Sequence, residues 1–359
     1  MSELIDKSTI ETLFERISSL ITIAHQKIAS TVNLTMVYTY YEIGRSIVEN
    51  EQEGNARASY GKQVLKKLSI RLNEHFGKGY SVDNLENMRQ FFLTFSKSET
   101  VSRISKSEIS ETVSRKFVLS WSHYLILMRV ENPLERNFYE NEAFNSQWSV
   151  RELQRQYNSS LFERLALSRD KTEVLRLAEE GHTIEKSTDL LKNPLTLAFL
   201  GMDEKSVYSE NDLETAIISK LQYFLLELGK GFLFEARQKR FTFDEEHFYV
   251  DLVFYNRLLQ CYVLVDLKTD KLVHQDLGQM QMYVNYFDRY VKQDHEKPTI
   301  GLVLCKYKKD TLIELTLPKD ANIYASEYSL YIPEKNVLQD KLNEWMEEFD
   351  TTNLQSQKQ

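Results

Sequence analysis

The sequence predicts a helical N-terminal domain followed by an α/β domain with a mixed central sheet. At 359 residues, the chain exceeds the length at which single hydrophobic cores usually stop growing, so two domains are expected. Apolar residues recur at spacings of three and four from residue 10 to about residue 165, which is the period of a helix. Further along, strand-like apolar runs and helical patterns follow one another in the order α-β-β-β-α-β-α-β. This order favours a mixed sheet with helices on its faces.

Several short helices are expected in the N-terminal domain, residues 1–167. Ser81 followed by an amphipathic stretch indicates one helix start, and Pro133 and the pair Trp148-Ser149 indicate two more. The sequence Ser-Glu-Thr-Val-Ser-Arg occurs twice between residues 98 and 115, in a polar setting without a core face. Residues 97–117 are therefore predicted to be a mobile insertion.

The second domain is predicted to follow a linker at residues 168–193, because that segment is polar and charged apart from a short element at 189–192. The domain then spans residues 194–348, and residues 349–359 are predicted to be a disordered tail. Helices are expected at 211–228, 275–290 and about 308–316, and strands at 232–243, 247–255, 260–268, 299–306 and 323–331.

The composition is that of an ordinary globular protein, with 42% hydrophobic and 27% charged residues. Cys261 and Cys305 each lie in an apolar run, so they are expected to be buried thiols in a reducing compartment, the cytoplasm. Neither a signal peptide nor a membrane-spanning run is apparent. The formal net charge of -8 argues against indiscriminate coating of nucleic acid but allows a local basic groove.

Three charged residues interrupt apolar strands. Asp251 lies within one predicted strand, and Asp266 and Lys268 end the next. An unpaired buried carboxylate is costly, so a partner charge or a metal is expected. Alternation places Asp266 and Lys268 on one face. If residues 256–259 form the hairpin loop, Asp266 becomes the diagonal neighbour of Asp251, about 7–8 Å away between backbones.

Two carboxylates at that separation can hold one hard cation, Mg²⁺ or Mn²⁺. Such an ion would polarise a phosphoryl oxygen and lower the pKa of a bound water. Lys268 would orient or help deprotonate that water and offset charge on the phosphate. The alternative is an ion pair of Asp266 with Lys268 at a strand end, with Asp251 on an edge strand. The spacing of the three residues does not decide between the two interpretations.

Other polar residues give weaker signals. Glu214 is a candidate site residue, although a capping box begun by Asn211 would also explain it. Gln279 is a second candidate, although it has the spacing of a solvated helix residue. Four residues of the strand that leads into the hairpin could contact a phosphate backbone or form an ordinary basic strand edge: Arg237, Gln238, Lys239 and Arg240. Neither His247 nor His274 has a second ligand at zinc spacing.

The spacing Asp-x(14)-Asp-x-Lys resembles the PD-(D/E)xK nuclease superfamily, with Val250 at the position of the motif's proline. The surrounding sequence is similar to the bacterial YhcG-like family, formerly a domain of unknown function. The similarity covers nearly the whole chain. It is carried by segments 41–45, 119–124, 148–153, 225–232, 237–238, 249–255, 261–268, 278–279 and 300–306.

This resemblance implies a helical N-terminal domain, DNA-binding or oligomerising, joined to a restriction-endonuclease-like core. It implies catalytic roles at Asp251, Asp266 and Lys268, with Glu214 and Gln279 as further site members. The expected function is a metal-dependent endonuclease that hydrolyses DNA in restriction, repair or recombination, and a homodimer would suit two cuts on a duplex. The alternative is a catalytically inactive nucleic-acid-binding or assembly subunit. Val273-His274, where relatives tend to carry Lys-Pro, leaves any substrate contact from that loop open.

Overall fold

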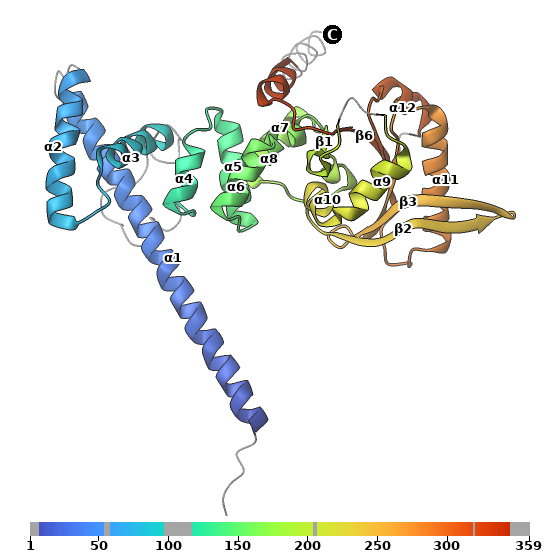
Figure 1. The fold of residues 1–359 in the computed structure, drawn as a ribbon, viewed down its shortest axis with the longest axis horizontal. Helices are drawn as coiled ribbons and strands as arrows, with labels where there is room; N and C mark the ends of the chain where they lie inside the picture. Colours follow the sequence, from blue (N-terminus) through green and yellow to red (C-terminus); the bar gives the residue numbers. More distant parts are fainter. Residues whose placement is uncertain (1–6, 54–57, 97–116, 204–206, 319, 345–359) are drawn as a thin grey trace, which may run out of the picture. The chain divides into compact units, whose positions relative to one another are not determined.

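The computed structural model describes residues 7–53, 58–96, 117–203, 207–318 and 320–344 (Figure 1). The chain divides into two compact units, residues 1–153 and 154–359. The predicted insertion at 97–117, apart from Phe117, and the predicted tail at 349–359 lie outside the described residues. Within the described residues, no helix is both long enough and apolar enough to cross a membrane.

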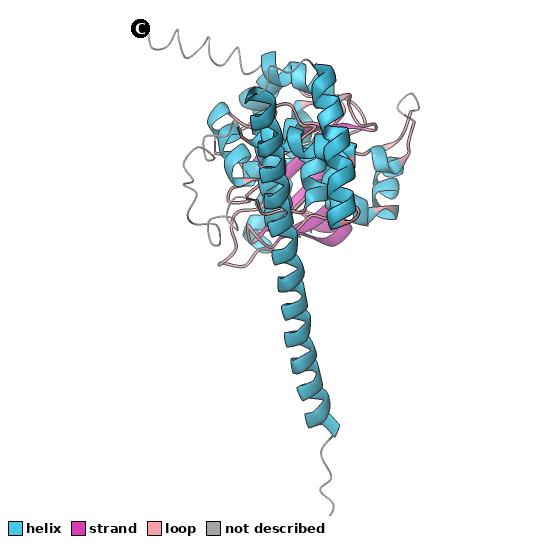
Figure 2. Cartoon of the chain, turned by 90° about the vertical axis from the view of Figure 1, so that its left-hand side faces the viewer, coloured by secondary structure: helices cyan, strands magenta, loops and turns pink. Residues whose placement is uncertain are grey.

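The first unit is helical, as predicted, but it begins with a single long helix where several short ones were expected. This helix, α1, has 47 residues, and Figure 2 shows that it continues well past the helices that pack on it. The other helices are α2 (Ala58–Phe76), α3 (Val82–Phe95), α4 (Trp121–Leu127), α5 (Pro133–Asn145) and the start of α6 (Val150–Asn158), while α1 itself runs over Lys7–Glu53.

Two local features of this unit explain its helix ends and its packing. The Ser81 side chain accepts a hydrogen bond from the Asn84 N–H at the start of α3, and Pro133 is the first residue of α5, so both predicted starts are confirmed. Gly44 lets α1 approach α3 closely, because a Cβ there would lie 2.0 Å from the Met88 carbonyl oxygen. Any larger residue at position 44 would push the two helices apart.

The second unit is built around a six-stranded mixed sheet with the order β1-β6-β5-β4-β3-β2. Strand β3 is antiparallel to both β2 and β4, whereas β4, β5, β6 and β1 run parallel to one another. The strands are β1 (Leu195–Thr196), β2 (Phe232–Phe243), β3 (Glu246–Asn256), β4 (Cys261–Leu267), β5 (Ile300–Cys305) and β6 (Ile323–Ser329). The predicted mixed sheet is confirmed. Strand β1 was not predicted, because a strand of two residues is too short to show the alternation of apolar and polar residues.

Helices cover both faces of this sheet, and each face has its own core. On one face lie α9 (Glu210–Ser219) and α10 (Leu221–Leu228), where a single helix was predicted at 211–228. Their residues Leu213, Ile217 and Phe224 pack against apolar residues of β3 and β4. On the other face lies α11 (His274–Tyr290), with α12 (Asp310–Thr316) beside it. The ends of β3 and β4 therefore lie between two layers of helix.

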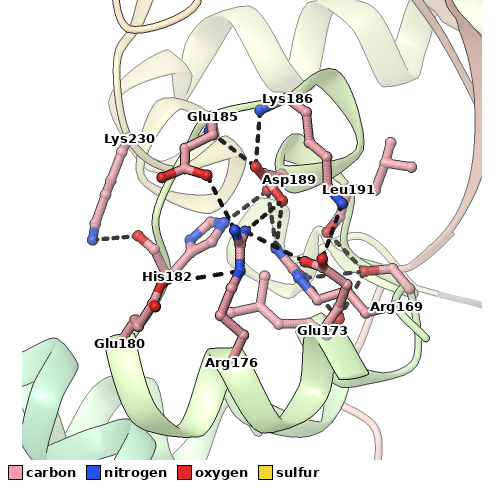
Figure 3. A network of polar contacts seen from close by, with 12 residues as sticks. Arg169, Glu173, Arg176, Glu180, His182, Glu185, Lys186, Asp189, Leu191 and Lys230 are labelled. Carbon is pink, nitrogen blue, oxygen red and sulfur yellow. Dashed lines mark hydrogen bonds and ion pairs between the residues drawn. The ribbon is translucent and has the colours of Figure 1, made fainter. Parts of the chain in front are cut away.

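The segment 168–193, predicted to be a linker, instead holds helix α8 (Lys171–Glu180) and the short 3₁₀ helix η3 (Ser187–Leu190), after α7 (Leu161–Ala166). A polar network centred on Asp189 holds it together (Figure 3). The Asp189 carboxylate accepts hydrogen bonds of 2.9 Å from the N–H groups of Glu185 and Lys186, and the Arg169 and Arg176 guanidinium groups lie 4.0 and 3.9 Å away. The polar composition of this segment suggested a linker, but its polar side chains form hydrogen bonds and ion pairs with one another inside a folded segment.

Candidate active site

The β3–β4 hairpin brings the two predicted carboxylates face to face. Its loop covers residues 257–260, because Asn256 pairs with Cys261, so the predicted register with a loop at 256–259 is wrong by two positions. The next step beyond the pair Leu252↔Val265 sets Asp251 directly opposite Asp266. Directly opposed residues have Cβ atoms about 4.5–5.5 Å apart, which is closer than the predicted diagonal.

The side chain of Asn256 explains this register. It is fully buried, and its amide oxygen accepts hydrogen bonds from the N–H groups of Leu258 (3.0 Å) and Leu259 (3.1 Å). Its amide nitrogen donates to the Lys230 carbonyl at 3.1 Å. A side chain that bonds to its own backbone two and three residues on closes a turn. Asn256 is therefore fixed as the last residue of β3 and cannot be the first of the loop.

Asp251 lies at a kink shared by β2 and β3. Gln238, opposite Asp251 in the β2–β3 register, has a left-handed backbone with φ 47°. Val250 and Val253 both pack against the α11 side of the sheet, although an odd spacing puts residues of a regular strand on opposite faces. The strand therefore changes face at Asp251, and simple alternation does not locate this carboxylate.

Asp266 and Lys268 lie at the end of β4. The Asp266 residue is 2% exposed, and its Oδ2 lies 2.9 Å from Lys268 Nζ. Burial, and after it the Asp251 carboxylate, raise the pKa of Asp266 to about 7, although Lys268 opposes both. For Lys268, burial lowers the pKa, but the carboxylates of Asp266, Glu210 and Asp251 together raise it above its usual value. Lys268 is therefore a cation at neutral pH, which suits it to balance negative charge.

Glu214 reaches the site from α9, on the opposite side from α11. It is 2% exposed, and it pairs with the Arg237 guanidinium and accepts a 2.6 Å hydrogen bond from the Gln238 amide. Ser209 and Asp212 form the capping box of α9, so the alternative that Glu214 caps a helix begun by Asn211 is wrong. Glu214 belongs to the same hydrogen-bonded group as Asp251.

Gln279 lies on α11, and its amide donates a hydrogen bond to the Tyr283 hydroxyl. Burial raises the pKa of Tyr283, the Gln279 hydrogen bond lowers it, and the carboxylates of Asp266 and Asp251 raise it, so this hydroxyl lies within electrostatic reach of both carboxylates. The sequence interpretation did not include Tyr283. A polar side chain one helical turn from Gln279 was the signal that could have identified it.

Glu210 is a second residue that the sequence interpretation missed. Its carboxylate lies 3.5 Å from Lys268 Nζ, one helical turn before Glu214 on α9. By contrast, His247 contacts Arg240 and Thr242 on the exposed part of the β2–β3 hairpin. His274 is the first residue of α11. Within the described residues, no group of three acidic, histidine or cysteine side chains is arranged to hold a metal ion alone.

The carboxylate pair nevertheless fits a hard divalent cation. Both carboxylates supply oxygen ligands, and the buried Asp266 Oδ2 has the Lys268 ammonium at 2.9 Å as its partner. Mg²⁺ commonly takes one or two carboxylates and completes its six ligands with waters and phosphate oxygens. A third protein carboxylate is therefore not required.

Both units match known families. Residues 16–164 match the DUF1016 N-terminal domain, and residues 188–343 match the YhcG PDDEXK nuclease domain. Over 349 residues the chain is 38% identical to "Putative nuclease YhcG" of Escherichia coli (strain K12), with 92% of each protein covered. The chain belongs to the YhcG family. The predicted resemblance is confirmed, and the segment of this chain that matches the nuclease domain, residues 188–343, contains all five candidate site residues.

Two solved structures match part of this YhcG-family chain. One is a repair endonuclease from Pyrococcus abyssi, with 17% identity over 36% of this chain and 50% of that chain and a TM-score of 0.24. The other is the EndoMS-dsDNA2 complex, with 15% identity over 37% of this chain and 50% of that chain and a TM-score of 0.25.

Proposed function

We propose that this protein is a metal-dependent endonuclease that hydrolyses phosphodiester bonds of DNA. The observation that carries the proposal is the proximity of the Asp251 and Asp266 carboxylates, one step beyond the last β3–β4 pair, Leu252↔Val265, with Lys268 Nζ 2.9 Å from Asp266. A buried carboxylate beside a second, half-buried one is repelled by it unless a cation lies between them. One lysine supplies a single positive charge, which leaves the pair undercompensated.

In this proposal Asp251 and Asp266 hold Mg²⁺ or Mn²⁺. The ion, when bound, would polarise the phosphate and lower the pKa of a water ligand. Lys268, held protonated by Asp266, would offset the charge that builds on the phosphate and orient the attacking water. Glu214 and Gln279 would border the site, Glu214 beside Asp251 and Gln279 through the Tyr283 hydroxyl.

The projecting part of the β2–β3 hairpin supports a nucleic-acid substrate. Lys239 and Arg240 are exposed there, whereas Arg237 and Gln238, also predicted to contact nucleic acid, are engaged by Glu214. Phosphate contacts of this kind are independent of sequence and weaken with salt. Replacing Arg240 with alanine should therefore lower the affinity for DNA. It should also reduce, by about one, the slope of the logarithm of the binding constant against the logarithm of the salt concentration.

The decisive experiment compares cleavage of supercoiled, linear and branched DNA, with RNA alongside, by wild type, Asp266→Asn and Asp310→Asn. Asp310 is an exposed acid on α12 that pairs with Lys308, so its amide variant is a matched control. Cleavage should need Mg²⁺ or Mn²⁺ and be lost only in Asp266→Asn. Cleavage that survives this change would contradict the proposal, and DNA binding without cleavage by wild type would favour the inactive-subunit alternative.

Two further expectations belong to the proposal. Cys261 and Cys305 are buried free thiols, which supports a reducing compartment, the cytoplasm. A homodimer would bring two sites to one duplex, and light scattering of the full chain with and without DNA would measure that stoichiometry. Roles in restriction, repair or recombination differ in the DNA they present, so the substrate comparison separates them.

A further inference from the structure

Gln238 has an unusual backbone for a residue inside a strand. Its φ of 47° lies in the left-handed region, which is unfavourable for residues other than glycine. The β2–β3 register places it directly opposite Asp251. Non-glycine residues in such a conformation persist only where surrounding contacts fix them, and they cluster at functional sites.

The contacts that fix Gln238 are two carboxylates. Its Nε2 donates to Glu214 Oε2 at 2.6 Å and to Asp251 Oδ1 at 3.0 Å. A side-chain amide nitrogen carries two hydrogens, so this one atom can serve both carboxylates at once. The reverse amide orientation would aim a carbonyl oxygen at two anions, which settles the assignment of nitrogen and oxygen.

With the Gln238 contact, both oxygens of the Asp251 carboxylate accept a hydrogen bond. Asp251 Oδ2 accepts a 2.8 Å hydrogen bond from the Leu267 N–H, so each oxygen of this carboxylate has one donor. Each carboxylate oxygen can accept two hydrogen bonds, which leaves capacity for a cation. Glu214 is held in turn by the Arg237 guanidinium, which also donates to the Thr215 hydroxyl at 3.0 Å.

We propose that Gln238 is a positioning residue for the metal site, aligning Asp251 with Glu214 across the kinked strand pair. This differs from the nucleic-acid contact that the sequence predicts for it. The inference rests on the proposed function, because it needs a cation at Asp251 and Asp266. The left-handed backbone serves this role, since it turns the Gln238 side chain toward α9 and the carboxylates.

Gln238→Gly is the sharpest variant. Glycine adopts a φ of 47° without strain, so the change removes the amide and keeps the backbone. Thr242→Gly is the matched control, because it puts a glycine in the same strand at an exposed residue whose hydroxyl contacts His247 and neither carboxylate. Thermal melts verify folding. If Gln238→Gly unfolds, Gln238→Asn replaces it: asparagine tolerates this backbone but is one methylene too short to bridge both carboxylates.

The measurement is calorimetric titration of the full chain with Mg²⁺ and with Mn²⁺. Residues that orient metal ligands usually change metal affinity about 10- to 100-fold when replaced. We expect that loss for Gln238→Gly and wild-type affinity for Thr242→Gly. In cleavage assays, Gln238→Gly should lower kcat, leave the KM for DNA unchanged and recover as Mn²⁺ is raised, which loss of a merely structural contact would not produce.

DNA binding without metal separates the two roles of β2. Gln238→Gly should bind DNA as wild type does, whereas Arg240→Ala should bind more weakly. Unchanged metal affinity in Gln238→Gly, beside an Asp251-dependent site in wild type, would overturn this inference alone. A wild-type protein without an Asp251-dependent metal site would overturn the proposed function and this inference together.

Discussion

Two buried acidic residues of the second unit, Asp189 and Asp266, have opposite surroundings. The Asp189 carboxylate accepts two backbone hydrogen bonds and lies among two arginines. Asp266 Oδ2 has one cationic partner, Lys268 Nζ at 2.9 Å, and burial together with the second carboxylate, Asp251, raises the pKa of Asp266 to about 7. The first acid is fully compensated and stabilises the fold, whereas the second keeps an unmet demand for positive charge. That demand marks a binding site.

The largest expected effect is on the undercompensated site. Lys268→Met keeps the apolar stem and removes the charge, so cleavage should fall on the order of 10²–10³-fold, as when one charge-stabilising group is deleted. Single-turnover cleavage at saturating Mg²⁺ measures this effect. A Lys308→Met variant, which removes a lysine paired with Asp310, should cleave as wild type does. Equal losses in both variants would contradict a site role for Lys268.

Asp189→Ala should give the largest loss of stability. The change leaves the buried Arg169 guanidinium and two backbone N–H groups without their acceptor, which costs about 3 kcal/mol in the free energy of unfolding. Urea titration of the full chain measures this cost. The folded variant should still cleave DNA, and a selective loss of cleavage would mean that the two clusters are not functionally distinct.

Asp266→Asn should change the free energy of unfolding in the opposite direction and stabilise the metal-free protein. In the metal-free protein it removes one of two facing carboxylates, so we expect the free energy of unfolding at pH 8 to rise by about 1–2 kcal/mol. Adding Mg²⁺ should stabilise wild type and leave the variant unchanged. Destabilisation of the variant in both conditions would favour the alternative in which Asp266 and Lys268 are a structural ion pair.

The pH dependence of the same pair follows from the raised pKa of Asp266. Below about pH 4 the carboxyl is protonated in both the folded and unfolded states, and between about pH 4 and pH 7 the folded state alone keeps the proton. This contribution to stability is therefore present at low pH and lost as pH rises toward 7. The difference between wild type and Asp266→Asn should be largest above pH 7 and shrink toward pH 4. Chemical denaturation at each pH measures it.

The smallest effect is expected at the rim of the Asp189 network. Arg176 is 31% exposed in its side chain and contacts four acids, Glu173, Glu180, Glu185 and Asp189. Arg176→Lys keeps the charge in a partly solvated position, where ion pairs contribute about 0–1 kcal/mol. Stability should change by less than about 1 kcal/mol in urea titration. A loss as large as that of Asp189→Ala would show that the rim arginine, and not the buried acid, holds the network together.

Much of the nuclease unit could be predicted from local sequence patterns. The order of its strands and helices follows from hydrophobic periodicity, and the charges at Asp251, Asp266 and Lys268 stand out because they interrupt buried strands. Segment 168–193 could not be predicted in the same way. Its polar residues form hydrogen bonds with one another, such as that from Arg169 to the Asp189 carbonyl at 3.3 Å. The local sequence shows that these residues are polar but does not show which of them will pair. The length of helix α1 was likewise not predicted, because several short helices were expected in the N-terminal domain.

The sequence by itself determined which residues carry charge into the sheet and that Asp266 and Lys268 share a strand face, because the two-residue period of a strand is a local property. Only the tertiary structure decided that Asp251 lies opposite Asp266. That register depends on how Asn256 closes the loop, and a shift of two residues preserves every periodic pattern while moving the partners apart. The tertiary structure also decided the place of Gln238, because its contacts join β2 to β3 and α9, and no spacing along the chain encodes them.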